Sequence, residues 1–200
     1  MGEELSNLKL RAGDIIVNIN TGRDPWSVIR RWGLGSPYTH CFMYMGVLRF
    51  GATRYRACAG RLPMIFESMG RGVSLRMLSD RYGQEVLVIR LTKYKRRISQ
   101  VLREAIKLAS DERSYYDYFC VVKYIIPRII WEKLHLPLGK MPLAWHRDSR
   151  QICSEALLEI CLRARIPILP DGILPLPGDF VTDSGLLVEV GTGRLSEEWV

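Results

Sequence analysis

The stretch Gln151-Ile152-Cys153-Ser154-Glu155-Ala156-Leu157-Leu158 places a cysteine at the start of a predicted amphipathic helix. Apolar or small residues recur there at helical spacing and predict one buried face: Cys153, Leu157, Ile160, Cys161 and Ala164. Cys153 would lie in the first turn, where unpaired backbone N–H groups and the positive end of the helix dipole favour thiolate over thiol. Cysteine is also often buried simply for packing. Cys153 is therefore a candidate nucleophile that needs a partner histidine elsewhere in the chain.

The composition is that of a globular protein with a sizeable core. The chain has 200 residues, 48% of them hydrophobic and 25% charged, which fits a single domain over 1–200. Its net charge of +8, from 29 Lys and Arg against 21 Asp and Glu, could favour nucleic acid, an anionic membrane or an acidic substrate. Because no aromatic-interleaved basic stripe accompanies the scattered arginines, we expect a solvated face and no nucleic-acid partner.

Cysteine usage and the N-terminus suggest a cellular compartment. The five cysteines are an odd number without a CxxC pair, which indicates reduced thiols and neither a disulfide framework nor a zinc site. The first ten residues have no basic region followed by an apolar run, so no signal peptide is predicted. We expect a cytoplasmic protein, with membrane association as an open alternative. Met1-Gly2 followed by Ser6 also meets the minimal myristoylation pattern, which is short and common by chance.

The order of predicted elements indicates an α+β fold. The first half of the chain is dominated by strands with short links, which form an antiparallel sheet. These strands are expected at 14–19, 38–46, 52–59, 64–68 and 85–92, with a short helix at 26–32 and a turn of helix at 74–78. Helices follow at 98–109 and 152–165, and a last strand at 185–190.

A proline-marked, aromatic segment separates the two later helices. Its most apolar part, 118–131, contains Lys123, Pro127 and Arg128 and is too short and too charged to span a membrane. We predict two short helices around Pro127 that pack on the core as a small subdomain. A membrane-surface contact through 118–136, or a lid over a site, remains an alternative.

Three histidines are the candidate bases for Cys153. His40 begins a strongly apolar strand, His135 lies between two leucines, and His146 lies in a polar stretch that leads to the cysteine helix. Strand alternation places His40 and Cys41 on opposite faces, so that one can face a site while the other packs. A catalytic imidazole needs such a rigid mount, which favours His40 and leaves His146 as the competitor.

Glu67 is the candidate that could orient the imidazole. It ends the apolar run Met64-Ile65-Phe66, where a buried carboxylate would be costly without a partner. An imidazole that activates a thiol works best when a third polar group fixes its orientation. Periodicity alone leaves open whether Glu67 faces a partner or is a charge at the strand edge. Asp14 has the same ambiguity, although Gly-Asp before a strand is common in turns.

The ordered set of motifs from Gly13 to Phe180 resembles a known enzyme family. The set is Gly13-Asp14-Ile-Ile-Val, Ser36-Pro-Tyr-Thr-His40-Cys-Phe-Met-Tyr-Met-Gly46, Ile65-Phe-Glu67-Ser with Gly72-Val73, Tyr116-Asp117-Tyr118, Ile152-Cys153-Ser154-Glu155 and Pro177-Gly178-Asp179-Phe180. It is similar to the circularly permuted papain-like thiol hydrolases, the YiiX-like relatives of the NlpC cell-wall peptidases, distantly akin to lecithin retinol acyltransferase. In that family the histidine strand precedes the cysteine helix, as it does here.

The resemblance implies a fold and a set of roles. The fold would be a papain-like antiparallel sheet or barrel, packed against helices that carry the nucleophile. Cys153 would be the nucleophile, His40 the general base and later acid, and Glu67 the residue that orients His40. Tyr116 and Asp117 match a family motif and would line the substrate site. No metal or cofactor would be needed.

The implied activity is cleavage of an amide through a thioester, in a peptide of cell-wall type or a lipid-linked amide. The Arg-rich stretch 49–61 and an insertion at about 119–150, expected to be helical, depart from the family pattern and leave the substrate open. An acyltransferase or phospholipase acting on lipid esters would use the same residues. A binding module on a catalytically inactive scaffold is the third possibility.

Overall fold

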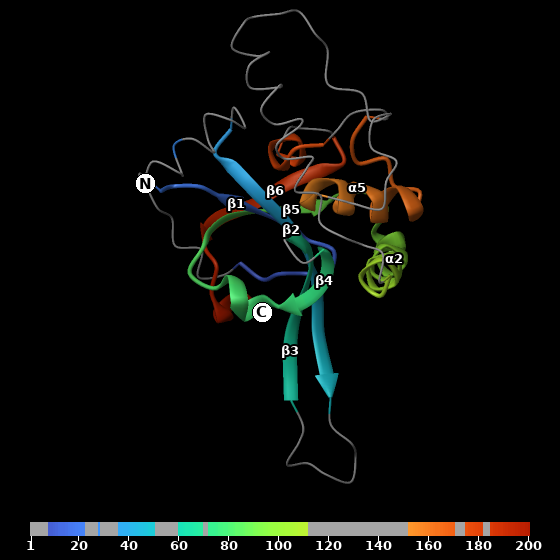
Figure 1. Ribbon diagram of the computed structural model, residues 1–200, viewed down its shortest axis with the longest axis horizontal. Coiled ribbons are helices and arrows are strands. Elements are labelled where there is room, and N and C mark those ends of the chain that lie inside the picture. The colour runs from blue at the N-terminus through green and yellow to red at the C-terminus, as the bar shows by residue number, and fades with distance from the viewer. Residues whose placement is uncertain are drawn as a thin grey trace, which may run out of the picture.

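The computed structural model describes residues 8–22, 28, 36–50, 60–69, 72–111, 152–170, 175–181 and 185–200. They form an α+β fold around one antiparallel sheet (Figure 1). Its strands are β1 (Ile15–Ile19), β2 (Tyr38–Phe50), β3 (Gly60–Met69), β4 (Gly72–Met77), β5 (Glu85–Leu91) and β6 (Leu187–Arg194). The described helices are α2 (Ile98–Ala109) and α5 (Cys153–Arg163), with the 3-10 turns η2 (Leu78–Arg81), η3 (Lys95–Arg97), η6 (Pro177–Phe180) and η7 (Glu197–Trp199).

The sheet has the strand order β4-β3-β2-β1-β5-β6, and each neighbouring pair is antiparallel. Strand β1 lies between β2 and β5, and Ile15, Ile16 and Val17 are fully buried because both faces of the sheet are covered there. Among the described strands, β4 and β6 are edges that do not pair with each other. The expected α+β class and antiparallel sheet are confirmed, and the described sheet is open rather than closed into a barrel.

Helices α2 and α5 cover one face of the sheet (Figure 1). Ile15 and Val17 belong there to the larger of the two apolar clusters, together with the α5 residues Leu157 and Ile160. Segments near the two ends of the chain cover the other face, where Trp199 packs in the same cluster as Ile16. Burying each of these large apolar side chains contributes roughly 1.5–3 kcal/mol. The sheet, which carries His40 on β2 and Glu67 on β3, is therefore packed on both faces.

The first turn of α5 is fixed by side-chain hydrogen bonds. Ile152 is extended, and its backbone N–H donates to Oε2 of Glu155 at 3.0 Å, which stabilises the helix start. The Ser154 hydroxyl donates to the carbonyl of Pro175 at 2.7 Å. Cys153 is consequently held as the first helical residue, where its own backbone N–H has no partner within the helix.

Most predicted elements within the described residues are confirmed. The strands expected at 14–19 and 85–92 and the helices at 98–109 and 152–165 form at those places, and the strand expected at 38–46 continues to Phe50. The helical turn expected at 74–78 is wrong, because Gly72–Met77 pairs along its length with β3 and helical structure begins only at Leu78. Gly72 has a φ of 97°, which favours glycine and lets the chain reverse into this hairpin.

Several expectations fall outside the described residues. They are the strand at 52–59, the insertion at about 119–150, the apolar segment 118–136 and, apart from Val28, the helix at 26–32. The single domain over 1–200 stays a prediction. Within the described ranges, no helix is long and apolar enough to cross a membrane.

Candidate active site

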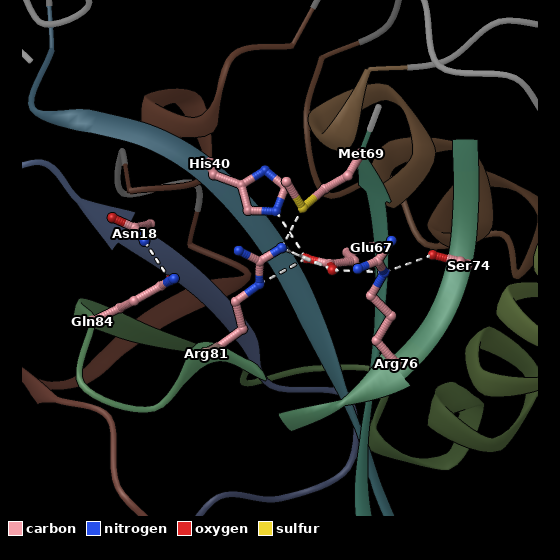
Figure 2. Close-up of polar contacts among 8 residues, drawn as sticks. All are labelled: Asn18, His40, Glu67, Met69, Ser74, Arg76, Arg81 and Gln84. Carbon is pink, nitrogen blue, oxygen red and sulfur yellow. Dashed lines mark hydrogen bonds and ion pairs between the residues drawn. The ribbon is translucent and has the colours of Figure 1, made fainter. Parts of the chain in front are cut away.

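His40 stands near the start of β2, in the middle of the sheet. Its register partner on β1 is Asn18, whose side-chain amide donates to Oε1 of Gln84 at 2.6 Å (Figure 2). Alternation along β2 puts Cys41 in the core cluster beneath α5, while His40 lies over Phe42 with ring centroids 5.9 Å apart. The His40 side chain is 18% exposed. The imidazole is therefore mounted on a rigid strand and is still reachable from solvent.

Glu67 on β3 points at His40 rather than outward. Its side chain is fully buried, and its Oε2 lies 3.1 Å from Nε2 of His40 (Figure 2). Arg81 donates to the same carboxylate from two nitrogens, Nε to Oε2 at 3.1 Å and Nη2 to Oε1 at 2.8 Å and to Oε2 at 2.6 Å. Arg76 on β4 approaches Oε1 to 3.4 Å. These partners compensate a carboxylate that would be too costly to bury alone.

The surroundings of Glu67 keep it ionised. Burial by itself would raise the pKa of the carboxyl, but the hydrogen bonds from His40 and Arg81 and their positive charges outweigh burial and hold the pKa of Glu67 below its usual value. A permanent negative charge therefore faces Nε2 of His40.

Cys153 meets His40 from the first turn of α5. The Cys153 side chain is buried and lies close enough to His40 and Cys41 for hydrogen bonding with these two residues to shift its pKa. Since Nε2 of His40 is engaged by Glu67, Nδ1 is the ring nitrogen left for the thiol. The imidazole thus lies between a buried carboxylate on β3 and a cysteine on α5, two elements far apart in the sequence.

The surroundings of Cys153 and His40 favour the charged form of each side chain. A hydrogen bond from the Cys41 thiol, together with the charge and hydrogen bond of His40, overcomes burial and places the pKa of Cys153 well below that of an ordinary thiol. Burial would lower the pKa of His40, but the Cys153 charge and hydrogen bond, followed by those of Glu67, raise this pKa to about 9. The two shifts run in opposite directions, and both favour the charged forms of the pair, a thiolate and an imidazolium.

Cys41 is a site residue that sequence reasoning missed. Burial, together with the neighbouring Cys153, raises the pKa of its thiol well above the usual value, so Cys41 stays protonated and can donate. The only sequence pattern that involved Cys41 was its alternation with His40 along a strand. That pattern predicted only that one of these two neighbours would pack in the core. In the fold Cys41 does pack in the core, and Cys153 lies against it there.

The structure brings together three of the residues singled out from the sequence and separates a fourth. His40, Glu67 and Cys153 converge, whereas Asp14 pairs with Arg90 at 2.7 Å on another part of the sheet. Arg81 and Arg76, which no sequence pattern indicated, complete the surroundings of Glu67. Some sequence candidates lie outside the described residues: Tyr116, Asp117, His135 and His146.

The fold is one already known from a solved structure. No family model matches the sequence, and no curated protein is significantly similar to it. One solved structure with this fold is that of YiiX from Escherichia coli O157:H7, described as a metalloprotein. It superposes with a TM-score of 0.58 and 16% sequence identity over 94% of this chain and 99% of that chain. The YiiX-like fold is therefore confirmed, and at this identity the likeness extends to the fold alone.

Proposed function

We propose that this protein is a cysteine hydrolase in which Cys153 is the nucleophile, His40 the general base and acid, and Glu67 the residue that orients His40. One observation carries the proposal: Nε2 of His40 lies 3.1 Å from the buried Glu67 carboxylate, and the Cys153 thiol lies close enough to the same imidazole for the two groups to shift each other's pKa. A nucleophile, a base within hydrogen-bond reach and a third group that orients the base are the parts that acyl transfer requires.

The first half of the reaction forms an acyl-enzyme. The Cys153 thiolate, whose proton already resides on His40, attacks the carbonyl carbon of an amide. The backbone N–H of Cys153 at the start of α5 is suited to donate to the oxyanion that develops. The His40 imidazolium then gives its proton to the leaving amine as the C–N bond breaks, which leaves a thioester on Cys153.

The second half regenerates the enzyme. Neutral His40 takes a proton from water, the hydroxide attacks the thioester carbonyl, and the C–S bond breaks to release a carboxylic acid and the thiolate. Glu67 keeps Nε2 of His40 occupied through both halves, so Nδ1 remains directed at the reacting atoms. Arg81 and Arg76 keep Glu67 charged while it does so.

The order of the elements supports assignment to the permuted papain-like hydrolases. In this chain the histidine strand β2 precedes the cysteine helix α5, and the fold is similar to that of YiiX. The substrate class that we propose is a peptide amide or a lipid-linked amide. Lipid esters would be cleaved or transferred by the same three residues, so acyl probes of both kinds belong in the test. We propose that any membrane contact is made through the segment 118–136, which lies outside the described residues.

A metal does not fit these residues. YiiX is described as a metalloprotein, but in the described part of this chain no three His, Cys, Asp or Glu side chains converge on a point where they could hold a metal. Both oxygens of Glu67 already accept hydrogen bonds from Arg81, and Nε2 of His40 faces Glu67. The proposed reaction therefore uses protein groups only.

Acyl trapping tests the proposal. The protein is mixed with an activated peptide acyl ester and, in parallel, with a short fatty acyl ester, and the acylated residue is located by mass spectrometry. We expect the acyl group on Cys153, with turnover lost in Cys153→Ala and His40→Gln. Full activity in Cys153→Ala, or acyl transfer mainly to Cys161 in the same helix, would contradict the proposal. An unreactive Cys153 in the wild type would favour a binding module.

A further inference from the structure

Arg81 makes the closest ionic contacts of Glu67. Its Nη2 reaches both carboxylate oxygens, at 2.8 and 2.6 Å, and its Nε reaches Oε2 at 3.1 Å. That same Oε2 faces Nε2 of His40, so one carboxylate oxygen serves two cationic side chains (Figure 2). The Arg81 side chain is only 13% exposed, and it also contacts the Met69 sulfur and lies over the Phe42 ring.

We propose that Arg81 is a positioning residue, which holds Glu67 against His40 and takes up part of the carboxylate charge, and thereby limits how strongly the imidazolium is stabilised. This inference rests on the proposed function. A carboxylate that shares its charge with a bidentate guanidinium attracts a second cation less than a carboxylate without one. His40 then keeps the ability to release its proton to the leaving group.

Within the described ranges, each ionisable group that lies close to His40 comes from a different element or contacts it through Glu67. Glu67 lies on β3, Arg76 on β4, Arg81 in η2 and Cys153 in α5, while the neutral Cys41 thiol neighbours Cys153 from β2. Arg76 makes one contact with the carboxylate, at 3.4 Å, and its side chain is 34% exposed. Arg81 is therefore the cation with which His40 principally shares Glu67.

The chain contains a matched control for Arg81. Arg90 on β5 makes the same kind of bidentate contact with the buried carboxylate of Asp14, Nε to Oδ1 and Nη2 to Oδ2 at 2.7 Å each. The other described partners of this pair are the carbonyl of Lys9 and the backbone N–H of Arg11. Arg90→Met therefore removes an equivalent ionic contact that does not touch His40.

The test follows carboxymethylation of Cys153 by iodoacetate across pH, read by mass spectrometry. The imidazolium attracts this anionic reagent, so the rate of carboxymethylation falls at high pH as His40 loses its proton. This fall is the upper limb of the pH profile. In Arg81→Met more of the Glu67 charge acts on His40, because only the Arg76 contact still shares it, and we expect the upper limb to move to higher pH by about one unit. Arg81→Lys restores a cation and should return the limb toward the wild type. Arg90→Met should leave the limb unmoved.

The outcomes separate this inference from the function on which it rests. An upper limb in Arg81→Met that stays in place or moves to lower pH, in protein shown to be folded by circular dichroism, overturns the role of Arg81. If Arg81→Met does not fold, Arg81→Gln keeps one donor to Glu67 and gives the same test, with the same direction expected. A wild-type Cys153 with no accelerated carboxymethylation at any pH would instead overturn the proposed function.

Discussion

Replacing Glu67 with glutamine keeps the shape of the side chain and removes the charge that faces His40. The carboxylate is fully buried and accepts hydrogen bonds from His40 and Arg81, so its loss leaves the Arg81 guanidinium without its counter-ion. Breaking a buried ion pair on one side typically costs about 3–5 kcal/mol of unfolding free energy. We expect Glu67→Gln to lose stability in that range near neutral pH, measured by chemical denaturation. Glu159→Gln, in an exposed pair with Arg163, is the control and should lose less than about 1 kcal/mol.

The cost of Glu67→Gln should depend on pH with a defined sign. Burial would raise the pKa of Glu67, but its partners outweigh burial and lower this pKa from 4.5, so the folded state binds the proton more weakly than the unfolded state. The stability that Glu67 contributes is therefore complete above pH 4.5 and falls as the pH drops below that value. We expect the difference in stability between wild type and variant to narrow in acid.

The same substitution should change the titration of His40. Burial opposes protonation of His40, and Cys153 contributes more than Glu67 to raising the pKa to about 9. In Glu67→Gln we therefore expect the His40 pKa, measured by NMR titration, to fall below about 9 and stay above 6.5. An unchanged His40 pKa, together with unchanged stability, would refute the argument that Glu67 acts on the imidazole.

Three further predictions concern the thiol, metals and the core. Cys41→Ala removes a hydrogen-bond donor to Cys153 and should raise the pH at which Cys153 becomes reactive by about one unit, whereas Cys41→Ser should largely restore the wild-type value. Equal reactivity of Cys153 in the wild type and both variants would exclude Cys41 from the site. Treatment with a chelator should leave the Cys153 alkylation rate unchanged. A fall in this rate that added zinc reverses would contradict the proposed metal-free site. Leu157 is fully buried where α5 covers the sheet, so Leu157→Ala should lower the free energy of unfolding, measured by chemical denaturation, by about 2–5 kcal/mol. A much smaller loss of stability would show that α5 does not pack as described.

Elements with strong local patterns could be predicted from the sequence. The apolar stripe of 98–109 and the β-forming run at 14–19 depend on neighbours close in sequence, and both formed where expected. The segment 72–77 was different, because its strand structure comes from pairing with β3 and not from local preference. The expected helical turn therefore appears only after the strand ends, at Leu78.

The three candidate side chains could be selected from the sequence, whereas the residues that surround them could not. A cysteine at a helix start, a histidine at a strand start and a carboxylate after an apolar run are local signals, and the fold brings these three together. Arg81 carries no such signal, since only the β3–β4 hairpin and the turn η2 return it to Glu67. Cys41 was visible as a packing residue, but its contact with Cys153 depends on where α5 crosses the sheet.

The pH dependence of Cys153 alkylation by iodoacetamide tests most directly whether Cys153 and His40 form a reactive ion pair. Cys161 lies in the same helix, and burial raises its pKa to about 12, so it serves as an internal reference within one digest. We predict that Cys153 is alkylated rapidly well below the pH at which an ordinary thiol ionises, and that His40→Gln moves this reactivity to higher pH. Alkylation of Cys153 as slow as that of Cys161 near neutral pH, or a pH profile unchanged by His40→Gln, would contradict the ion pair.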